Sequence, residues 1–164
     1  MRVLLVNPKS NLPIDTRTSP SLGIAYLAAV SEQRGDEARI HDGDVEEFPV
    51  AEAVRQFEPA LIGISANTTQ VMSAWREAQT IKAVAPATPI ILGGPHPTIL
   101  PHESLERPEI DGVARGEGEE TWRALSERVA AGQDWTGVAG LSYRRDGQIV
   151  DEPDRPALEL DSLP

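Results

Sequence analysis

The sequence of 164 residues contains no cysteine. Without thiols the chain forms no disulfide, no thiolate zinc site and no cysteine-bound iron–sulfur cluster. Positive charge is also scarce. The chain has 15 Lys and Arg but 26 Asp and Glu, which gives a formal net charge of -11. Nucleic-acid binding draws its affinity from clustered Lys and Arg, so we expect no nucleic-acid partner.

Long apolar runs are missing as well. No run approaches the roughly 20 apolar residues that a helix needs to span a bilayer, and the apolar start of the chain, 1–6, is too short for the core of a secretory signal. We therefore expect a cytoplasmic protein with no export signal and no membrane partner. The length suits one good hydrophobic core, which predicts one domain with an appendage.

The chain alternates short apolar runs with amphipathic segments. The runs at 3–6, 61–64 and 90–92 suit central strands that are covered on both faces, and weaker strands are expected at 39–41 and 111–114. The first predicted helix has Ser19 as N-cap and Pro20 at its first position. Others are expected at 50–57, at 71–85 and around Trp122, the last ending at Gly132. This order predicts an α/β, flavodoxin-like, doubly wound five-stranded parallel sheet, with strand order 2-1-3-4-5.

The C-terminal part differs from this alternation. Residues 138–150 predict a β-hairpin that turns at Asp146-Gly147. Beyond it lies an acidic segment that contains Pro153, Pro156 and Pro164. This composition is typical of a linker. We therefore divide the chain into a Rossmann-like domain at 1–134, a hairpin appendage at 135–151 and a linker at 152–164.

Unusual residues follow the strands at their carboxyl ends, where ligands bind to open α/β sheets. They form the segments 7–8, 65–69, 93–97 and 116–119. Each has a structural alternative: Gly93-Gly94 turns the chain, the polar residues at 65–69 cap a helix, and the acids at 117–119 complement a helix dipole. The functional interpretation of the two glycines is a slot for a flat heterocycle, because neither residue has a Cβ.

The spacing of these segments resembles the cobalamin-binding fold of corrinoid methyltransferases and mutases. Gly23 is followed after 41 residues by Ser65, and after 27 more by Gly93-Gly94. The family pattern D-x-H-x-x-G, S-x-L, G-G uses nearly the same intervals. Pro20 takes the position of the cobalt-ligating histidine, and proline cannot ligate a metal. The resemblance therefore implies base-off cobalamin with no protein ligand from this position.

The segments 19–28, 93–97, 111–113, 116–119 and 160–164 together resemble the N-terminal domain of cobalamin-dependent radical S-adenosylmethionine enzymes. This family includes methylases and the anaerobic magnesium-protoporphyrin ester cyclase. Its catalytic domain carries a C-x-x-x-C-x-x-C motif for a 4Fe–4S cluster that reduces S-adenosylmethionine, and this chain has no cysteine. The chain is therefore either cut just before that domain, which we favour, or a stand-alone corrinoid carrier. Alone it is expected to bind its cofactor without turnover.

The resemblance and the strand ends together predict one set of cofactor-binding residues and no catalytic or metal-ligating residue. In the family, the slot beside the glycine pair holds the dimethylbenzimidazole nucleotide tail, and the serine bonds it. Glu117 is expected to accept hydrogen bonds from neutral corrin amides. The three histidines lack metal-ligand spacing and are expected on the surface or in loops, with His96 beside the site. The predicted set is Asn7, Pro8, Ser19, Pro20, Leu22, Gly23, Ser65, Asn67, Thr68, Thr69, Gly93, Gly94, Pro95, His96, Gly116, Glu117 and Gly118.

Other functions share the predicted fold. A phosphoacceptor receiver needs acids after the first strand and an Asp that ends the third, but Asn7 and Ser65 stand there. A carrier of flavin mononucleotide needs a phosphate-cradling loop after the first strand, which residues 7–11 only partly provide. A cofactor-free interaction or substrate-recognition module is the third alternative, because each predicted site residue also suits a cap or a turn.

Overall fold

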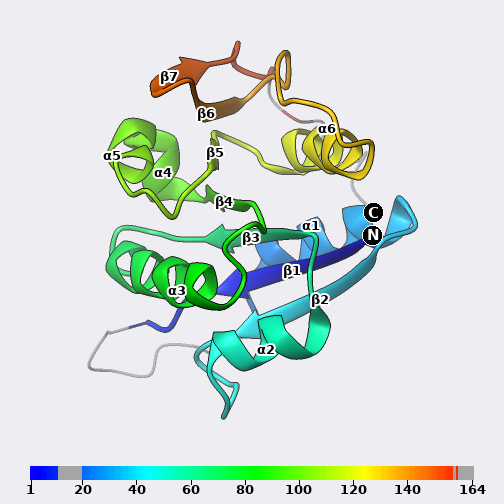
Figure 1. Cartoon of the computed structure of the whole chain (residues 1–164), viewed down its shortest axis with the longest axis vertical. Helices are drawn as coiled ribbons and strands as arrows, with labels where there is room; N and C mark the ends of the chain where they lie inside the picture. Colours follow the sequence, from blue (N-terminus) through cyan, green and yellow to red (C-terminus); the bar gives the residue numbers. More distant parts are fainter. Residues whose placement is uncertain (11–19, 157, 159–164) are drawn as a thin grey trace.

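The computed structural model describes residues 1–10, 20–156 and 158, and a single sheet forms its centre (Figure 1). Within this part of the chain the strand order is β2-β1-β3-β4-β5-β6-β7. The first five strands run parallel, and the last two are antiparallel to their neighbours. The strands are β1 (Arg2–Asn7), β2 (Glu37–Asp42), β3 (Leu61–Ser65), β4 (Ile90–Gly93), β5 (Gly112–Ala114), β6 (Leu141–Arg145) and β7 (Gln148–Asp151).

Helices cover both faces of the sheet, with α2 and α3 on one face and α1 and α6 on the other (Figure 1). Successive side chains of a strand point to opposite faces. Leu4 therefore packs in the cluster with α2 and α3, whereas Leu5 packs in the cluster with α1 and α6. The helices are α1 (Leu22–Gln33), α2 (Val50–Phe57), α3 (Val71–Val84), α4 (Pro95–Ile99), α5 (Pro101–Leu105) and α6 (Glu119–Ala130).

The predicted flavodoxin-like order 2-1-3-4-5 is confirmed, but the strand count is seven rather than five. The predicted hairpin forms, and Asp146 and Gly147 turn it with φ values of 53° and 77°. It continues the sheet instead of standing apart, because β6 pairs with β5 in the register Val113↔Ser142. An uncovered β5 would present unpaired backbone groups at the edge of the sheet, and the hairpin satisfies them.

The first helix begins later than predicted. Its first residue is Leu22, and the carbonyl of Ser21 accepts the first helical hydrogen bond, from the amide of Ala25 at 3.1 Å. Pro20 therefore precedes the helix and is not its first residue. The predicted cap, Ser19, lies outside the described residues.

The segment 93–97, which follows β4, contains the start of α4. Pro95 occupies the first turn of this helix, where a missing N–H costs nothing. The amide and the hydroxyl of Thr98 both donate to the carbonyl of Gly94, at 3.1 and 2.9 Å. This single helical turn fixes the chain directly after β4.

Residues 152–155, the start of the predicted linker, lie against the sheet and α6. The Arg115 guanidinium, on the loop after β5, donates to the carbonyl of Glu152 and pairs with Asp154 at 3.0 Å. Arg155 donates to the Thr121 hydroxyl at 3.0 Å. The linker at 152–164 stays a prediction, since residues 157 and 159–164 lie outside the described part.

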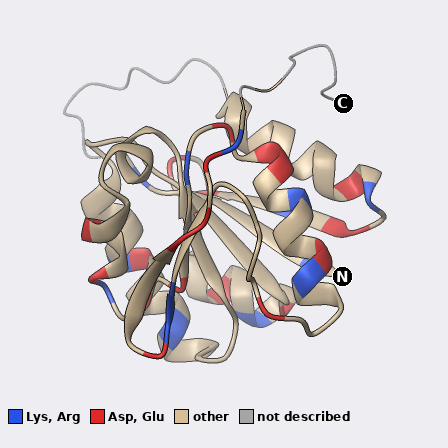
Figure 2. Cartoon of the chain, turned by 90° about the horizontal axis from the view of Figure 1, so that it is seen from above, with Lys and Arg blue, Asp and Glu red and all other residues tan. Residues whose placement is uncertain are grey.

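Charged residues gather on the helices and connecting segments, whereas β3 and β4 carry none (Figure 2). In this view Lys and Arg are scattered among Asp and Glu. No helix in the described ranges is long and apolar enough to cross a membrane.

Candidate functional site

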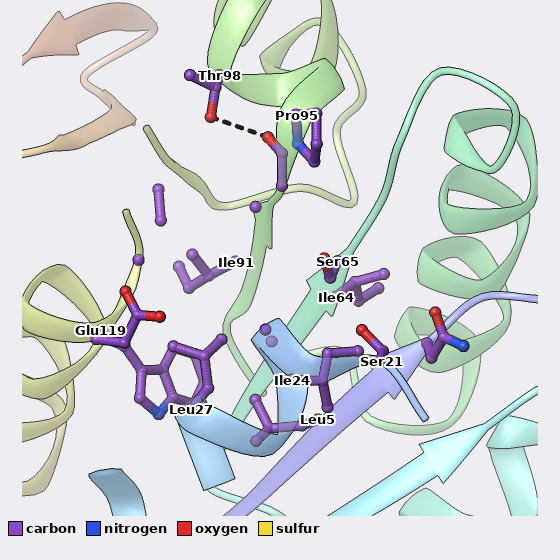
Figure 3. A pocket seen from close by; sticks show the side chains of 18 of the residues that line it. Leu5, Ser21, Ile24, Leu27, Ile64, Ser65, Ile91, Pro95, Thr98 and Glu119 are labelled. Carbon is purple, nitrogen blue, oxygen red and sulfur yellow. Dashed lines mark hydrogen bonds between the residues drawn. The ribbon is translucent and has the colours of Figure 1, made fainter. Parts of the chain in front are cut away.

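A pocket of about 520 Å³ opens at the carboxyl ends of β1, β3, β4 and β5, on the face that α1 and α6 cover (Figure 3). The alternation of side chains along each strand brings most of its strand residues to this face, and Ile64, which packs in the cluster on the other face, is the exception. The strand residues that line the pocket are Leu5 and Asn7, Gly63, Ile64 and Ser65, Ile91 and Gly93, and Ala114. This is the edge at which the sequence predicted a ligand.

The floor of the pocket is apolar and tightly packed. A Cβ at Gly63 would lie 2.9 Å from Leu5 Cδ2 and 3.0 Å from the ring of Trp122, so the glycine lets these two side chains close the floor. Above the floor there is open space. A Cβ at Gly93 would meet only Ala114, at 3.8 Å or more, and one at Gly23 would meet nothing within 4 Å.

The two adjacent glycines have different surroundings. Gly94 has φ +99°, and a Cβ there would lie 2.8 Å from the carbonyl oxygen of Ala66. The backbone after β3 and the backbone after β4 therefore touch at Gly94. Gly93 pairs with Ser65 in the sheet, and both line the pocket. The turn interpretation thus explains Gly94, whereas Gly93 leaves the space beside Ser65 open.

Ser65 and Asn67 differ in whether their polar atoms are occupied. The Ser65 hydroxyl makes no hydrogen bond with another described residue and faces the pocket. Asn67 Oδ1 accepts from the amide and the hydroxyl of Thr69, at 2.9 and 2.7 Å, and from the amide of Gln70 at 3.1 Å. Asn67 therefore organises the turn before α3, as the capping alternative predicts, and Ser65 is free for a ligand.

Gln70, which the sequence did not single out, connects this turn to the chain after β1. Its side-chain amide donates to the carbonyl of Pro8 at 2.9 Å and to Asn7 Oδ1 at 3.3 Å. Asn7 in turn donates to Asp42 at 3.0 Å. These bonds hold the ends of β1, β2 and β3 together on one side of the pocket.

A family model of the B12 binding domain matches residues 16–126, which include the ends of β3, β4 and β5 that line this pocket but not the end of β1. The chain belongs to the B12-binding domain family. An uncharacterized methyltransferase of Pyrococcus horikoshii is 35% identical to it over 172 aligned residues, which cover 100% of this chain and 37% of the relative. The anaerobic magnesium-protoporphyrin IX monomethyl ester cyclase of Rubrivivax gelatinosus is 32% identical over 170 residues, 97% of this chain and 31% of the relative.

This B12-binding domain spans about a third of the length of both relatives, 37% and 31%. A solved structure of the cobalamin-dependent S-adenosylmethionine radical enzyme OxsB, with aqua-cobalamin and S-adenosylmethionine bound, has the same fold with a TM-score of 0.82. It is 22% identical, and the match covers 95% of this chain and 22% of that one. Together these findings confirm the resemblance to cobalamin-dependent radical S-adenosylmethionine enzymes.

The structure brings most of the predicted site residues to the pocket. Those that line it are Asn7, Gly23, Ser65, Asn67, Gly93, Gly94, Pro95, Gly116, Glu117 and Gly118. Six others, Pro8, Pro20, Leu22, Thr68, Thr69 and His96, are not among its lining residues, and Ser19 lies outside the described part of the chain. Other residues that line the pocket were not predicted from the sequence: Leu5, Ser21, Ile24, Leu27, Gly63, Ile64, Gln70, Ile91, Thr98, Ala114, Glu119 and Trp122. Strand alternation was the signal for Leu5, Gly63 and Ile91, which share a face with Asn7, Ser65 and Gly93.

The lining fits a flat heterocycle and neutral amides. The floor is apolar, Gly93 leaves a gap beside the free hydroxyl of Ser65, and Glu117 lies exposed at the mouth. The lining contains two carboxylates, Glu117 and Glu119, and no Lys or Arg from the described ranges. A pyrophosphate would be repelled here, whereas the amide side chains of a corrin ring are neutral donors.

Two of the three histidines, His41 and His96, are buried and lie in a strand and a helix, so the expectation of surface or loop positions is wrong for both. His41 is 3% exposed because Phe48 folds over it, with ring centroids 5.6 Å apart. Burial lowers the pKa of His41, although Glu46 and Asp42 act in the opposite direction. No group of three or more His, Asp or Glu in the described residues is arranged to hold a metal ion.

Glu77 on α3, which accepts a hydrogen bond from the backbone of Lys9, makes the stability of the domain depend on pH. Burial raises the pKa of Glu77 to about 7, against the lowering effects of the Lys9 backbone hydrogen bond and Arg76, and Asp42 adds to the rise. The folded state therefore binds this proton more tightly than the unfolded chain, whose value is 4.5. The resulting stability is fully present below pH 4.5 and is lost as the pH rises through about 7.

We expect Glu77→Gln to remove this dependence. As the pH rises from 4.5 to 8, the wild type should lose about 2 kcal/mol of its free energy of unfolding, and the variant should keep it. This is less than the whole pKa shift would give, because the side chain is partly exposed. Urea denaturation at both pH values measures the difference. Glu47→Gln, at an exposed position, is the matched control, and pH profiles that stay parallel for Glu77→Gln would contradict the prediction.

Proposed function

We propose that this chain is the cobalamin-binding domain of a longer cobalamin-dependent radical S-adenosylmethionine enzyme, and that it holds cobalamin base-off. One observation carries the proposal: Gly23, Ser65 and Gly93, far apart in the sequence, line a single pocket at the carboxyl edge of the sheet. These are the positions that the family pattern assigns to the nucleotide tail. The family match over residues 16–126 supports the same placement.

The nucleotide tail would enter between the ends of β3 and β4. Gly93 leaves the gap, and the free hydroxyl of Ser65 supplies a hydrogen bond to the base. The corrin ring would cover the mouth and the neighbouring start of α1, where Leu22 is 66% exposed. Glu117, exposed at the same mouth, would accept hydrogen bonds from corrin amides. When bound, cobalamin supplies the cobalt chemistry of methyl transfer or a related radical reaction.

Two of the histidines, His96 and His102, favour a corrinoid without a ligand from either of them. Pro20 occupies the position of the ligating histidine. His96 Nε2 lies 3.0 Å from Glu103 and its Nδ1 lies 3.4 Å from the Thr68 hydroxyl. His102 pairs with Asp151 at 2.8 Å. Because each of these rings is already held by other side chains, neither is free to ligate cobalt.

The chemistry of the whole protein would need a partner domain. The chain spans about a third of its curated relatives, and it has no cysteine for an iron–sulfur cluster. A downstream radical S-adenosylmethionine domain would hold S-adenosylmethionine and the 4Fe–4S cluster and would select the substrate. The present chain would bind cobalamin and present it to that domain without turning over on its own.

Cobalamin retention tests the proposal. The purified chain is incubated with hydroxocobalamin and desalted, and the visible spectrum and the cobalt-to-protein ratio are recorded. We expect near-stoichiometric retention and a base-off spectrum that His96→Ala leaves unchanged. No retention by a chain that is folded by circular dichroism would contradict cobalamin binding and favour a cofactor-free module. A spectrum that changes in His96→Ala would contradict the absence of a histidine ligand.

A further inference from the structure

Glu119 is a buried acid that faces the pocket without a partner. It is the first residue of α6 and is 6% exposed, and its Oε2 has no hydrogen-bond partner among the described residues. In Figure 3 its carboxyl group points from α6 into the pocket, on the side of Ile91. Buried polar atoms in folded proteins nearly always have a partner, so this carboxyl group is arranged for a ligand.

Among the residues that the structure describes, the walls around Glu119 offer no donor of their own. Leu27 of α1 and Ile91 of β4 line the same pocket and are apolar. The indole N–H of Trp122, on the same helix, already donates to the Ser31 hydroxyl at 2.8 Å. The nearest cation along the helix, Arg123, pairs with Glu120 at 3.2 Å. A donor for Glu119 must therefore come from whatever fills the pocket.

The depth of Glu119 indicates which part of a corrinoid it meets. Ile91 lies two residues before Gly93 on β4, on the same face, so it is about 7 Å deeper along the strand. A base that enters beside Gly93 approaches the level of Ile91 and Glu119. The corrin amides stay at the mouth, near the exposed Glu117.

We propose that Glu119 selects the lower base of the corrinoid by accepting a hydrogen bond from an N–H or O–H group on that base. The inference rests on the proposed function. Dimethylbenzimidazole, bound to its ribose, presents only C–H and methyl groups and one ring nitrogen that accepts, so it offers the Glu119 oxygens no donor. Adenine carries an exocyclic amine and satisfies the carboxylate. The domain therefore prefers a cobamide whose lower base is adenine.

Titration with two probes tests this preference. Hydroxocobalamin, with dimethylbenzimidazole, and the hydroxo form of the cobamide with adenine are each titrated into the chain, and binding is followed by the visible spectrum. A charge-assisted hydrogen bond should make the wild type bind the adenine cobamide at least about tenfold more tightly. Glu119→Leu should reverse this ratio, because it removes the acceptor and gives the pocket an apolar wall.

Two variants separate selection from a structural role. Glu117→Gln, at the mouth, should leave the ratio between the two probes unchanged. Glu119→Gln keeps an acceptor oxygen and should retain part of the preference for adenine. If Glu119 serves only the helix dipole, Glu119→Leu will lower the melting temperature of the ligand-free chain and leave the ratio as it was, which would overturn the inference.

The outcomes also separate this inference from the proposed function. Equal affinity of the wild type for the two cobamides overturns the selection by Glu119 and leaves cobalamin binding in place. Binding of neither cobamide by the folded wild type overturns both. A preference for dimethylbenzimidazole that Glu119→Leu does not change likewise contradicts the inference.

Discussion

Replacing Gly93 with leucine should abolish the retention of hydroxocobalamin and leave the ligand-free domain folded. Gly93 lies outside the left-handed region of φ, and a Cβ there would meet only Ala114, at 3.8 Å from its oxygen and 3.9 Å from its Cβ. The backbone therefore tolerates a side chain, but that side chain projects into the pocket beside Ser65. We expect the affinity to fall at least about 100-fold, which corresponds to about 2.8 kcal/mol.

A graded series makes this test specific. In Gly93→Ala, Gly93→Val and Gly93→Leu the affinity for hydroxocobalamin should fall stepwise as the side chain grows. The thermal unfolding of the ligand-free variants should stay close to that of the wild type, because no backbone atom obstructs the new side chain. A leucine variant that still retains cobalamin at one equivalent would place the nucleotide tail elsewhere.

The sheet could be predicted because its signals are local. The apolar run at 3–6 is continuous, which indicates a strand covered on both faces, and Leu4 and Leu5 indeed pack on opposite sides. The Asp146-Gly147 pair predicts the hairpin turn through the positive φ that both residues adopt. The order of strands then places Gly23, Ser65 and Gly93 at one edge, so the position of the pocket also follows from the sequence.

The remaining features depend on tertiary contacts that a single sequence does not display. The hairpin pairs with β5 because that strand would otherwise be an uncovered edge of the sheet. No residue of the hairpin identifies β5 as its partner in the sequence. His41 is buried because Phe48 folds over it. Glu119 reads as an ordinary acid in the first turn of a helix, and only the packing of α6 against the sheet shows that it faces the pocket.

Gly94→Ala should have the largest effect on stability, although it adds one methyl group. Gly94 combines φ +99° with ψ -176°, a region of the backbone that is essentially reserved for glycine. The new Cβ would also lie 2.8 Å from the carbonyl oxygen of Ala66 and 3.0 Å from its nitrogen, which are backbone atoms and cannot rotate away. We expect a loss of about 3 kcal/mol, or roughly 6–12 °C in melting temperature for a chain of this length.

Gly93→Ala is the matched control for this loss, since the same methyl group one residue earlier meets no backbone atom closer than 3.8 Å. Differential scanning calorimetry of the two ligand-free variants measures the contrast. A large drop for Gly94→Ala alone would mean that Gly94 serves the contact between the chain after β3 and the chain after β4, and that only Gly93 is free to serve a ligand. Equal melting temperatures would contradict this assignment of different roles to Gly93 and Gly94, because both would then be ordinary turn residues.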